Sequence, residues 1–183
     1  IFLAFLQRSS YRKMKENLKI NWLKKLDELP ATNWEEIYHL IILPFYKENL
    51  EVLRSTFQAL IKSKYPLNKM IIVLGVEERA GMSAVEIAEQ IKKEFEEKFF
   101  KFLITIHPQN IIGELAGKGA NMTWEGRRAK ELVDDLGIPY ENIIVSSLDI
   151  DTQVFPYYFA CLSFNYLTCS DPLHSSFQPV PMY

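Results

Sequence analysis

The chain has 183 residues, 48% of them hydrophobic and 24% charged, which is typical of one ordinary folded domain with a real core. The net charge of −2 at pH 7 gives no electrostatic reason to expect a nucleic-acid partner. The two cysteines, Cys161 and Cys169, are too few for a disulfide framework, and their spacing matches no common zinc motif.

Residues 1–36 combine an apolar start with a basic stretch. The apolar run from Ile1 to Leu6 is followed by Arg8, Arg12, Lys13, Lys15, Lys19, Lys24 and Lys25. An apolar segment followed by basic residues is typical of the cytoplasmic flank of a membrane span, although the chain has no run of about eighteen apolar residues itself. We therefore expect either a juxtamembrane helix, with membrane attachment through segments outside this chain, or an amphipathic helix that packs on the domain through Leu18, Trp22, Leu23 and Leu26.

Four apolar runs recur at intervals of about thirty residues: Leu40–Leu43, Met70–Leu74, Phe102–Ile106 and Ile143–Leu148. Helical patterns lie between them. Strands that alternate with helices of this length indicate βαβ units and a largely parallel sheet. The sequence therefore predicts a Rossmann-like α/β domain over residues 37–183.

Helix ends are marked by capping residues. Asn49 is a plausible N-cap for the helix after the first strand, and Ser83 with Glu86 forms a Ser-x-x-Glu capping box for the next. A third helix is expected from about Asn121 to Leu136, ended by Gly137. A fourth, partly buried helix is expected between Val154 and Cys169, with Pro156 in its first turn, beside the ligand site.

Asp149 and Asp151 follow the last apolar run. In an extended chain, residues i and i+2 point to the same face, so these two carboxylates are expected to project together. Open α/β sheets bind ligands at the carboxyl ends of their strands. Two hard oxygen ligands suit a divalent cation that is shared with a diphosphate. We therefore predict a Mg²⁺ or Mn²⁺ site at Asp149 and Asp151.

Further polar residues follow the other strands. Tyr46 and Glu48 lie after Pro44, and the adjacent acids Glu77 and Glu78 follow the second strand, where they can accept hydrogen bonds from a base or ribose. The glycine-rich segment from Gly117 to Asn121 contains Lys118, a point charge suited to a diphosphate, but lacks the Walker A spacing. Taken singly, each motif is also compatible with an ordinary turn or solvated loop.

Together these motifs resemble the family-2 glycosyltransferases, which have a GT-A fold, over roughly residues 38–183. The resemblance lies in the Pro-x-Tyr-x-Glu turn, the acids after the second strand, the Gly-Lys-Gly-Ala-Asn segment and the Asp-x-Asp motif. It implies metal-dependent transfer of a sugar from a nucleotide sugar, expected to be UDP-linked, to an acceptor with inversion. The implied donor-binding residues are Pro44, Tyr46, Glu48, Glu77, Glu78, Lys118, Asn121 and Asp149, with Asp149 and Asp151 holding Mg²⁺ or Mn²⁺.

The chain departs from the family pattern in two places. Glu77-Glu78 replaces the usual Asp-Asp, and Asp171, in a Ser-Asp-Pro turn, is the only acid after Asp151. The Gln-x-x-Arg-Trp motif of the processive members is absent. We therefore expect a donor-binding domain that is incomplete at its C-terminus, with the catalytic base and acceptor site beyond Tyr183. By the same resemblance and the basic start, the parent protein is expected at the cytoplasmic face of a bacterial plasma membrane.

Two alternative functions stay open from the sequence. A nucleotidyltransferase would carry a glycine-rich basic loop after the first strand, where this chain has Pro-Phe-Tyr-Lys-Glu. A non-catalytic interaction domain of a membrane assembly would use Asp149 and Asp151 as turn residues only. Metal-dependent nucleotide binding distinguishes a donor-binding site from an interaction domain.

Overall fold

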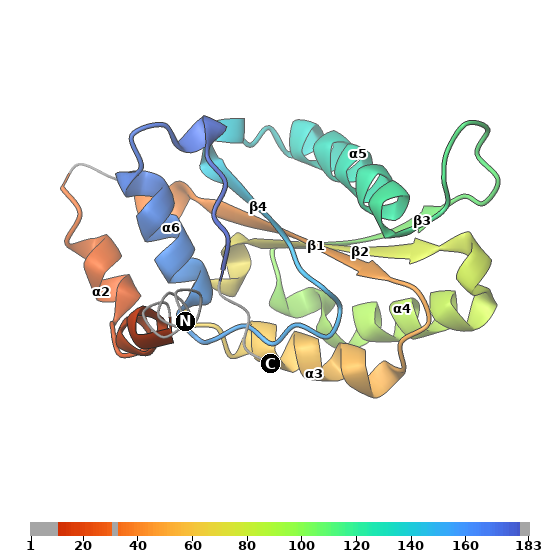
Figure 1. Ribbon diagram of the computed structural model, residues 1–183, viewed down its shortest axis with the longest axis horizontal. Coiled ribbons are helices and arrows are strands. Elements are labelled where there is room, and N and C mark those ends of the chain that lie inside the picture. Colours follow the sequence, from red (N-terminus) through yellow and green to blue (C-terminus); the bar gives the residue numbers. More distant parts are fainter. Residues whose placement is uncertain (1–10, 31–32, 180–183) are drawn as a thin grey trace, which may run out of the picture.

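The computed structural model describes residues 11–30 and 33–179 and contains a four-stranded, all-parallel sheet covered by helices (Figure 1). The strands are β1 (Tyr38–Phe45), β2 (Met70–Glu77), β3 (Lys101–His107) and β4 (Ile143–Ser147). Each of them contains or overlaps one of the four apolar runs. The predicted Rossmann-like α/β class is therefore confirmed at the level of a parallel sheet flanked by helices.

The order of the strands creates a reversal beside β1. The helices are α2 (Trp22–Asp27), α3 (Leu50–Ile61), α4 (Met82–Phe95), α5 (Lys118–Leu136) and α6 (Tyr158–Thr168). The chain passes from β1 through α3 to β2 and through α4 to β3, then returns through α5 on the opposite face to β4 (Figure 1). In the resulting order, β3-β2-β1-β4, strands β2 and β3 are added on one side of β1 and β4 on its other side, so the direction in which strands are added reverses between β1 and β4. In open α/β sheets the crevice for a ligand forms at such a point.

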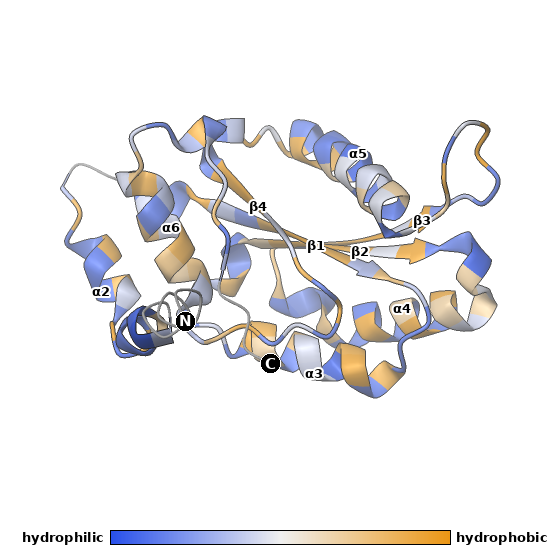
Figure 2. Ribbon diagram, in the orientation of Figure 1, coloured by the Kyte–Doolittle hydropathy of each residue, from blue (hydrophilic) through white to orange (hydrophobic). Residues whose placement is uncertain are grey.

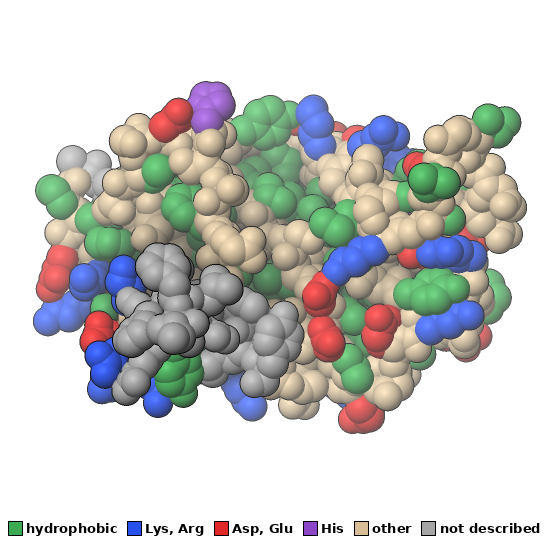
Figure 3. Space-filling model, viewed as in Figure 1, with side chains coloured by type: hydrophobic (Ala, Val, Ile, Leu, Met, Phe, Trp, Pro, Cys, Tyr) green, Lys and Arg blue, Asp and Glu red, His purple; other side chains and the backbone are tan. Residues whose placement is uncertain are grey.

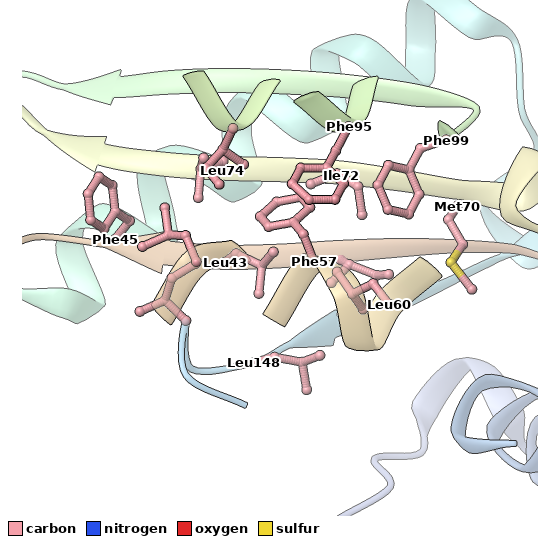
Figure 4. Packing of buried hydrophobic residues seen from close by; sticks show 14 of the residues in the cluster. Leu43, Phe45, Phe57, Leu60, Met70, Ile72, Leu74, Phe95, Phe99 and Leu148 are labelled. Carbon is pink, nitrogen blue, oxygen red and sulfur yellow. The ribbon is translucent and has the colours of Figure 1, made fainter. Parts of the chain in front are cut away.

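The larger core lies between the sheet and helices α3, α4 and α6 (Figure 4). The ring centroid of Phe57 on α3 lies 5.3 Å from that of Phe95 on α4 and 5.5 Å from that of Phe102 on β3. All residues of β2 are buried, because helices cover both faces of the sheet. Apolar residues accordingly dominate β1 and β2, whereas α5 carries many hydrophilic ones (Figure 2). This packing fixes the loops at the carboxyl ends of the strands.

Two of the predicted helix ends are confirmed and two are wrong. The Asn49 side chain accepts a hydrogen bond from Val52 N at 3.0 Å, and Gly137 is left-handed with φ 64°. The capping box is absent, because α4 begins at Met82 after Gly81, whose φ of 91° makes the turn, so Ser83 lies inside the helix. The third helix begins at Lys118 rather than Asn121, since Asn121 N already donates to Gly117 O at 3.1 Å.

Helix α6 was expected beside the ligand site and instead lies against α2. The rings of Trp22 on α2 and Phe164 on α6 are 5.3 Å apart, and Trp22 and Leu26 are buried. The helix begins only at Tyr158, because the Pro156 carbonyl is engaged outside it by Lys64 N at 2.7 Å. None of the described residues of α6 lines the pocket presented below.

The basic start of the chain is described from residue 11, and residues 11–17 are helical. The apolar run from Ile1 to Leu6 and Arg8 lie outside the described residues. No helix in the described ranges is both long enough and apolar enough to span a membrane. Residues 22–27 pack on the domain through Trp22 and Leu26, as the amphipathic alternative expected, whereas Leu18 is 40% exposed.

Candidate functional site

A pocket of about 430 Å³ opens at the carboxyl edge of the sheet, near the ends of β1 and β4. It is lined by Pro44, Phe45, Tyr46, Glu48, Glu77, Arg79, Lys118, Asn121, Asp149, Ile150 and Asp151. All of the predicted site residues except Glu78 are among them. Glu78 belongs to the next short turn, where its carboxylate accepts a hydrogen bond from Gln109 N at 2.8 Å. The structure thus brings together residues from four separate segments of the chain.

The turn after β1 is held by its own glutamate. Glu48 Oε2 accepts hydrogen bonds from the backbone N–H groups of Tyr46, at 2.9 Å, and Lys47, at 3.0 Å. The strand includes Pro44 and ends one residue later, at Phe45. Glu48 therefore fixes the backbone that presents the Tyr46 ring to the pocket.

The end of β2 contributes an ion pair that includes a residue absent from the sequence-based prediction. Glu77 is buried and its Oε2 accepts a hydrogen bond from Arg79 Nε. The Arg79 guanidinium carbon also lies 5.0 Å from the centroid of the Tyr46 ring, within the range of a cation–π contact. A basic residue directly after the paired acids was the sequence signal for Arg79. The contact joins the loops after β1 and β2 into one wall.

Asp149 and Asp151 lie in a turn rather than in an extended segment. β4 ends at Ser147, and Thr152 N donates to Asp149 O at 2.9 Å, so the expected extended backbone is wrong here. Both aspartates are exposed and line the pocket, whereas Ile150 between them is buried at 3% exposure. Thr56 Oγ1 on α3 anchors the turn by donating to Ile150 O at 2.5 Å.

Lys118 forms an ion pair with Asp149 across the pocket. The two side chains are 56% and 62% exposed, and such solvated pairs contribute little to stability. Acidic side chains outnumber basic ones on the pocket wall by four to two (Figure 3 shows acidic and basic side chains gathering right of centre). The pocket therefore presents excess negative charge beside an exchangeable lysine.

The same wall offers two carboxylates to a cation. Asp149 and Asp151 are the only pair of aspartates lining the pocket in the described part of the chain. No group of three or more His, Cys, Asp or Glu side chains is arranged to hold a metal ion there. A cation at this position would take its remaining oxygen ligands from a bound molecule or from solvent.

Beneath the first turns of α5 lies a buried polar group that the sequence analysis did not identify. Asn121 Nδ2 donates to Gly75 O at 2.9 Å, and the Glu125 side chain lies directly over Gly75. Glu125 is completely buried, and neither of its carboxyl oxygens has a hydrogen-bond partner of normal geometry among the described residues. Burial raises the pKa of Glu125 to about 8. A glycine inside a buried strand was the available signal, because it marks a close approach.

A second cavity, of about 170 Å³, adjoins the first and shares Glu77 and Arg79 with it. His107 ends β3, and its Nε2 lies 2.7 Å from Glu114 Oε1. His174 is exposed and its Nδ1 lies 2.8 Å from Asp171 Oδ1, and neither residue lines the pocket. His39 is the second residue of β1, its Nε2 lies 2.9 Å from Ser163 Oγ of α6, and it does not line the pocket.

In comparisons with known proteins, no family model and no curated protein matches this sequence.

Proposed function

We propose that the pocket binds a nucleotide sugar and that this domain is the donor-binding part of an inverting, metal-dependent glycosyltransferase with a GT-A fold. The main support is that residues after β1, β2 and β4 and at the start of α5 line one pocket where the strand order reverses. Its volume of about 430 Å³ lies within the range of small-molecule sites. The wall combines an aromatic ring, buried acceptors, a lysine and two aspartates, which are the groups that a nucleoside diphosphate requires.

On this proposal the base and ribose bind at the Tyr46 end of the pocket. The Tyr46 ring offers an aromatic face beside Arg79, and the Glu77 carboxylate offers an acceptor for the neutral O–H or N–H donors of the nucleoside. Glu48 acts indirectly, because its carboxylate oxygen is engaged by the backbone of the turn. Glu78 is not part of the pocket wall, so Glu77 is the acid assigned to the nucleoside.

The diphosphate binds at the other end of the pocket, beside Lys118, Asp149 and Asp151. An excess of acidic side chains would repel a diphosphate unless a cation accompanied it. Asp149 and Asp151 would hold Mg²⁺ or Mn²⁺, which prefer such hard oxygen ligands and leave positions for phosphate oxygens. The bound cation would supply charge neutralisation for the departing diphosphate. Lys118 would exchange Asp149 for a phosphate oxygen, since both partners of its ion pair are exposed.

Calorimetric titration with uridine diphosphate tests this proposal. Binding is expected in the presence of Mn²⁺ and is expected to disappear with excess chelator. Asp149→Asn and Asp151→Asn should each weaken binding at least tenfold while leaving the unfolding transition unchanged. Asp135→Asn removes the same charge from an exposed position of α5 outside the pocket and should bind like the wild type.

The opposite results favour the interaction-domain alternative. Absence of metal-dependent binding by the folded chain would contradict a complete donor site in this pocket. Equal binding by Asp149→Asn and Asp135→Asn would remove the aspartates from the site.

A further inference from the structure

The side of α5 that faces the sheet changes character along its length. Its C-terminal half packs apolar side chains on the sheet, with Ala129, Leu132 and Leu136 in one cluster with Ile71 and Val73. Its N-terminal half presents Asn121 and Glu125 to Gly75, and both are buried. The helix thus becomes polar where it approaches the pocket.

Glu125 and Gly75 fit together closely. A Cβ atom built on Gly75 would lie 2.1 Å from Glu125 Cδ, so the carboxyl group occupies the space that any other residue would fill. The neighbouring Asn121 holds the same point of β2 through its hydrogen bond to Gly75 O, and its Oδ1 has no partner in the described ranges. The first turns of α5 therefore rest on a single backbone position through two polar side chains.

The surroundings of Glu125 favour its neutral form. Burial of the carboxyl group raises its pKa and outweighs two opposing groups among the described residues: the backbone N–H of Gly75, and Lys118 on the same helix, which already pairs with Asp149. On β2, Glu77 is paired with Arg79, and on β3, His107 lies against Glu114. β1 places the uncharged Pro44 opposite Gly75. A carboxylate buried without hydrogen bonds of normal geometry is unstable, whereas a carboxylic acid is tolerated there.

We propose that Glu125 is a positioning residue of the pocket. In its neutral form it holds the first turns of α5 against Gly75, and when it ionises it no longer holds them there. Lys118 and Asn121 belong to those turns and line the pocket, so release withdraws both from a bound ligand. The effect on nucleotide binding rests on the proposed function, but the pH-dependent contact of α5 with Gly75 does not. Nucleotide binding should accordingly weaken on the alkaline side.

The ligand-free chain gives the first test. In an NMR titration from pH 5 to pH 10, the Glu125 side-chain carboxyl carbon, assigned by its absence in Glu125→Gln, should shift with a midpoint near 8. The backbone amides of Gly75 and Asn121 should shift with the same midpoint, and those of Glu125→Gln should not. Two results would overturn the contact between α5 and Gly75, whether or not UDP binds. One is a midpoint near that of an ordinary glutamate, and the other is amide signals that do not shift during the titration.

Binding gives the second test. With Mg²⁺ and UDP, the wild type should bind about tenfold more weakly at pH 9 than at pH 6.5, because only about a tenth of the molecules keep Glu125 neutral. Glu125→Gln should lose much less affinity, and Glu89→Gln, at an exposed position of α4, should behave like the wild type. An equal loss in wild type and Glu125→Gln would overturn the coupling to the pocket. Absence of UDP binding at every pH, with the NMR titration as predicted, would count against the proposed function alone.

Discussion

Replacing Gly75 by alanine tests the contact between β2 and α5 without changing any charge. The new Cβ would lie 2.1 Å from Glu125 Cδ and 2.3 Å from Glu125 Cγ. The Glu125 side chain is fully buried, so it cannot relieve the clash by moving into solvent. Overpacking of this kind costs about 1–3 kcal/mol. Against it stands a gain of about 0.5–1 kcal/mol, because alanine restricts the unfolded chain more than glycine does. We expect a net destabilisation of about 1–2 kcal/mol.

The sign of the effect should reverse when Glu125 is truncated. In a Glu125→Ala background the clash is gone, and Gly75→Ala should stabilise the protein by about 0.5–1 kcal/mol. A double-mutant cycle measured by urea unfolding at pH 6.5 would give a coupling of about 2 kcal/mol. Gly126→Ala is the control, because nothing lies within 4 Å of its Cβ position, and it should stabilise α5 equally in both backgrounds. Additive effects of Gly75→Ala and Glu125→Ala would refute the contact.

Three further predictions concern stability. Burial raises the Glu125 pKa from 4.5 to about 8. The contribution of Glu125 to the free energy of unfolding is therefore full below pH 4.5 and is lost as the pH rises through 8. Thermal unfolding over this range should show a loss of stability of at most about 5 kcal/mol, which Glu125→Gln abolishes. Arg79→Ala should lower the urea midpoint of unfolding, because it leaves the buried Glu77 carboxylate unpaired, and Glu77→Gln should reduce that effect. Asn49→Ala should lower the free energy of unfolding by about 1 kcal/mol, because α3 loses its N-cap. Gln58→Ala, on the exposed side of the same helix, should change stability little. Equal effects of the two substitutions would contradict the capping role.

The sheet could be predicted from the sequence because its central strands, β1 and β2, are buried on both faces, and because all four strands contain apolar runs. The edge at which polar loops meet followed from the parallel arrangement, so Tyr46, Lys118 and Asp149 were expected to lie near one another. Local backbone geometry was harder to predict from the sequence. The turn at Asp149 depends on a hydrogen bond that Thr152 N donates to Asp149 O, and the start of α4 depends on the positive φ of Gly81; no periodicity encodes either feature.

The buried carboxyl group could not be located from sequence alone. Glu125 lies in a charged stretch of a helix, where an exposed position is the ordinary expectation. Its burial depends on how α5 is rotated over β2, and only a glycine inside that strand hinted at the contact. The choice between Glu77 and Glu78 likewise depends on where β2 ends, which places Glu77 in the pocket wall and Glu78 in the next turn.

Where a paramagnetic cation binds in the presence of UDP tests the central claim most directly. Substoichiometric Mn²⁺ added to the ¹⁵N-labelled chain broadens the NMR signals of amides close to the ion. With UDP present, we predict that the signals of Asp149, Ile150, Asp151 and Lys118 disappear first, and that those of Glu131 and Asp135 persist. Broadening spread over the exposed acids of α5 and unchanged by UDP would contradict a nucleotide–metal site in this pocket.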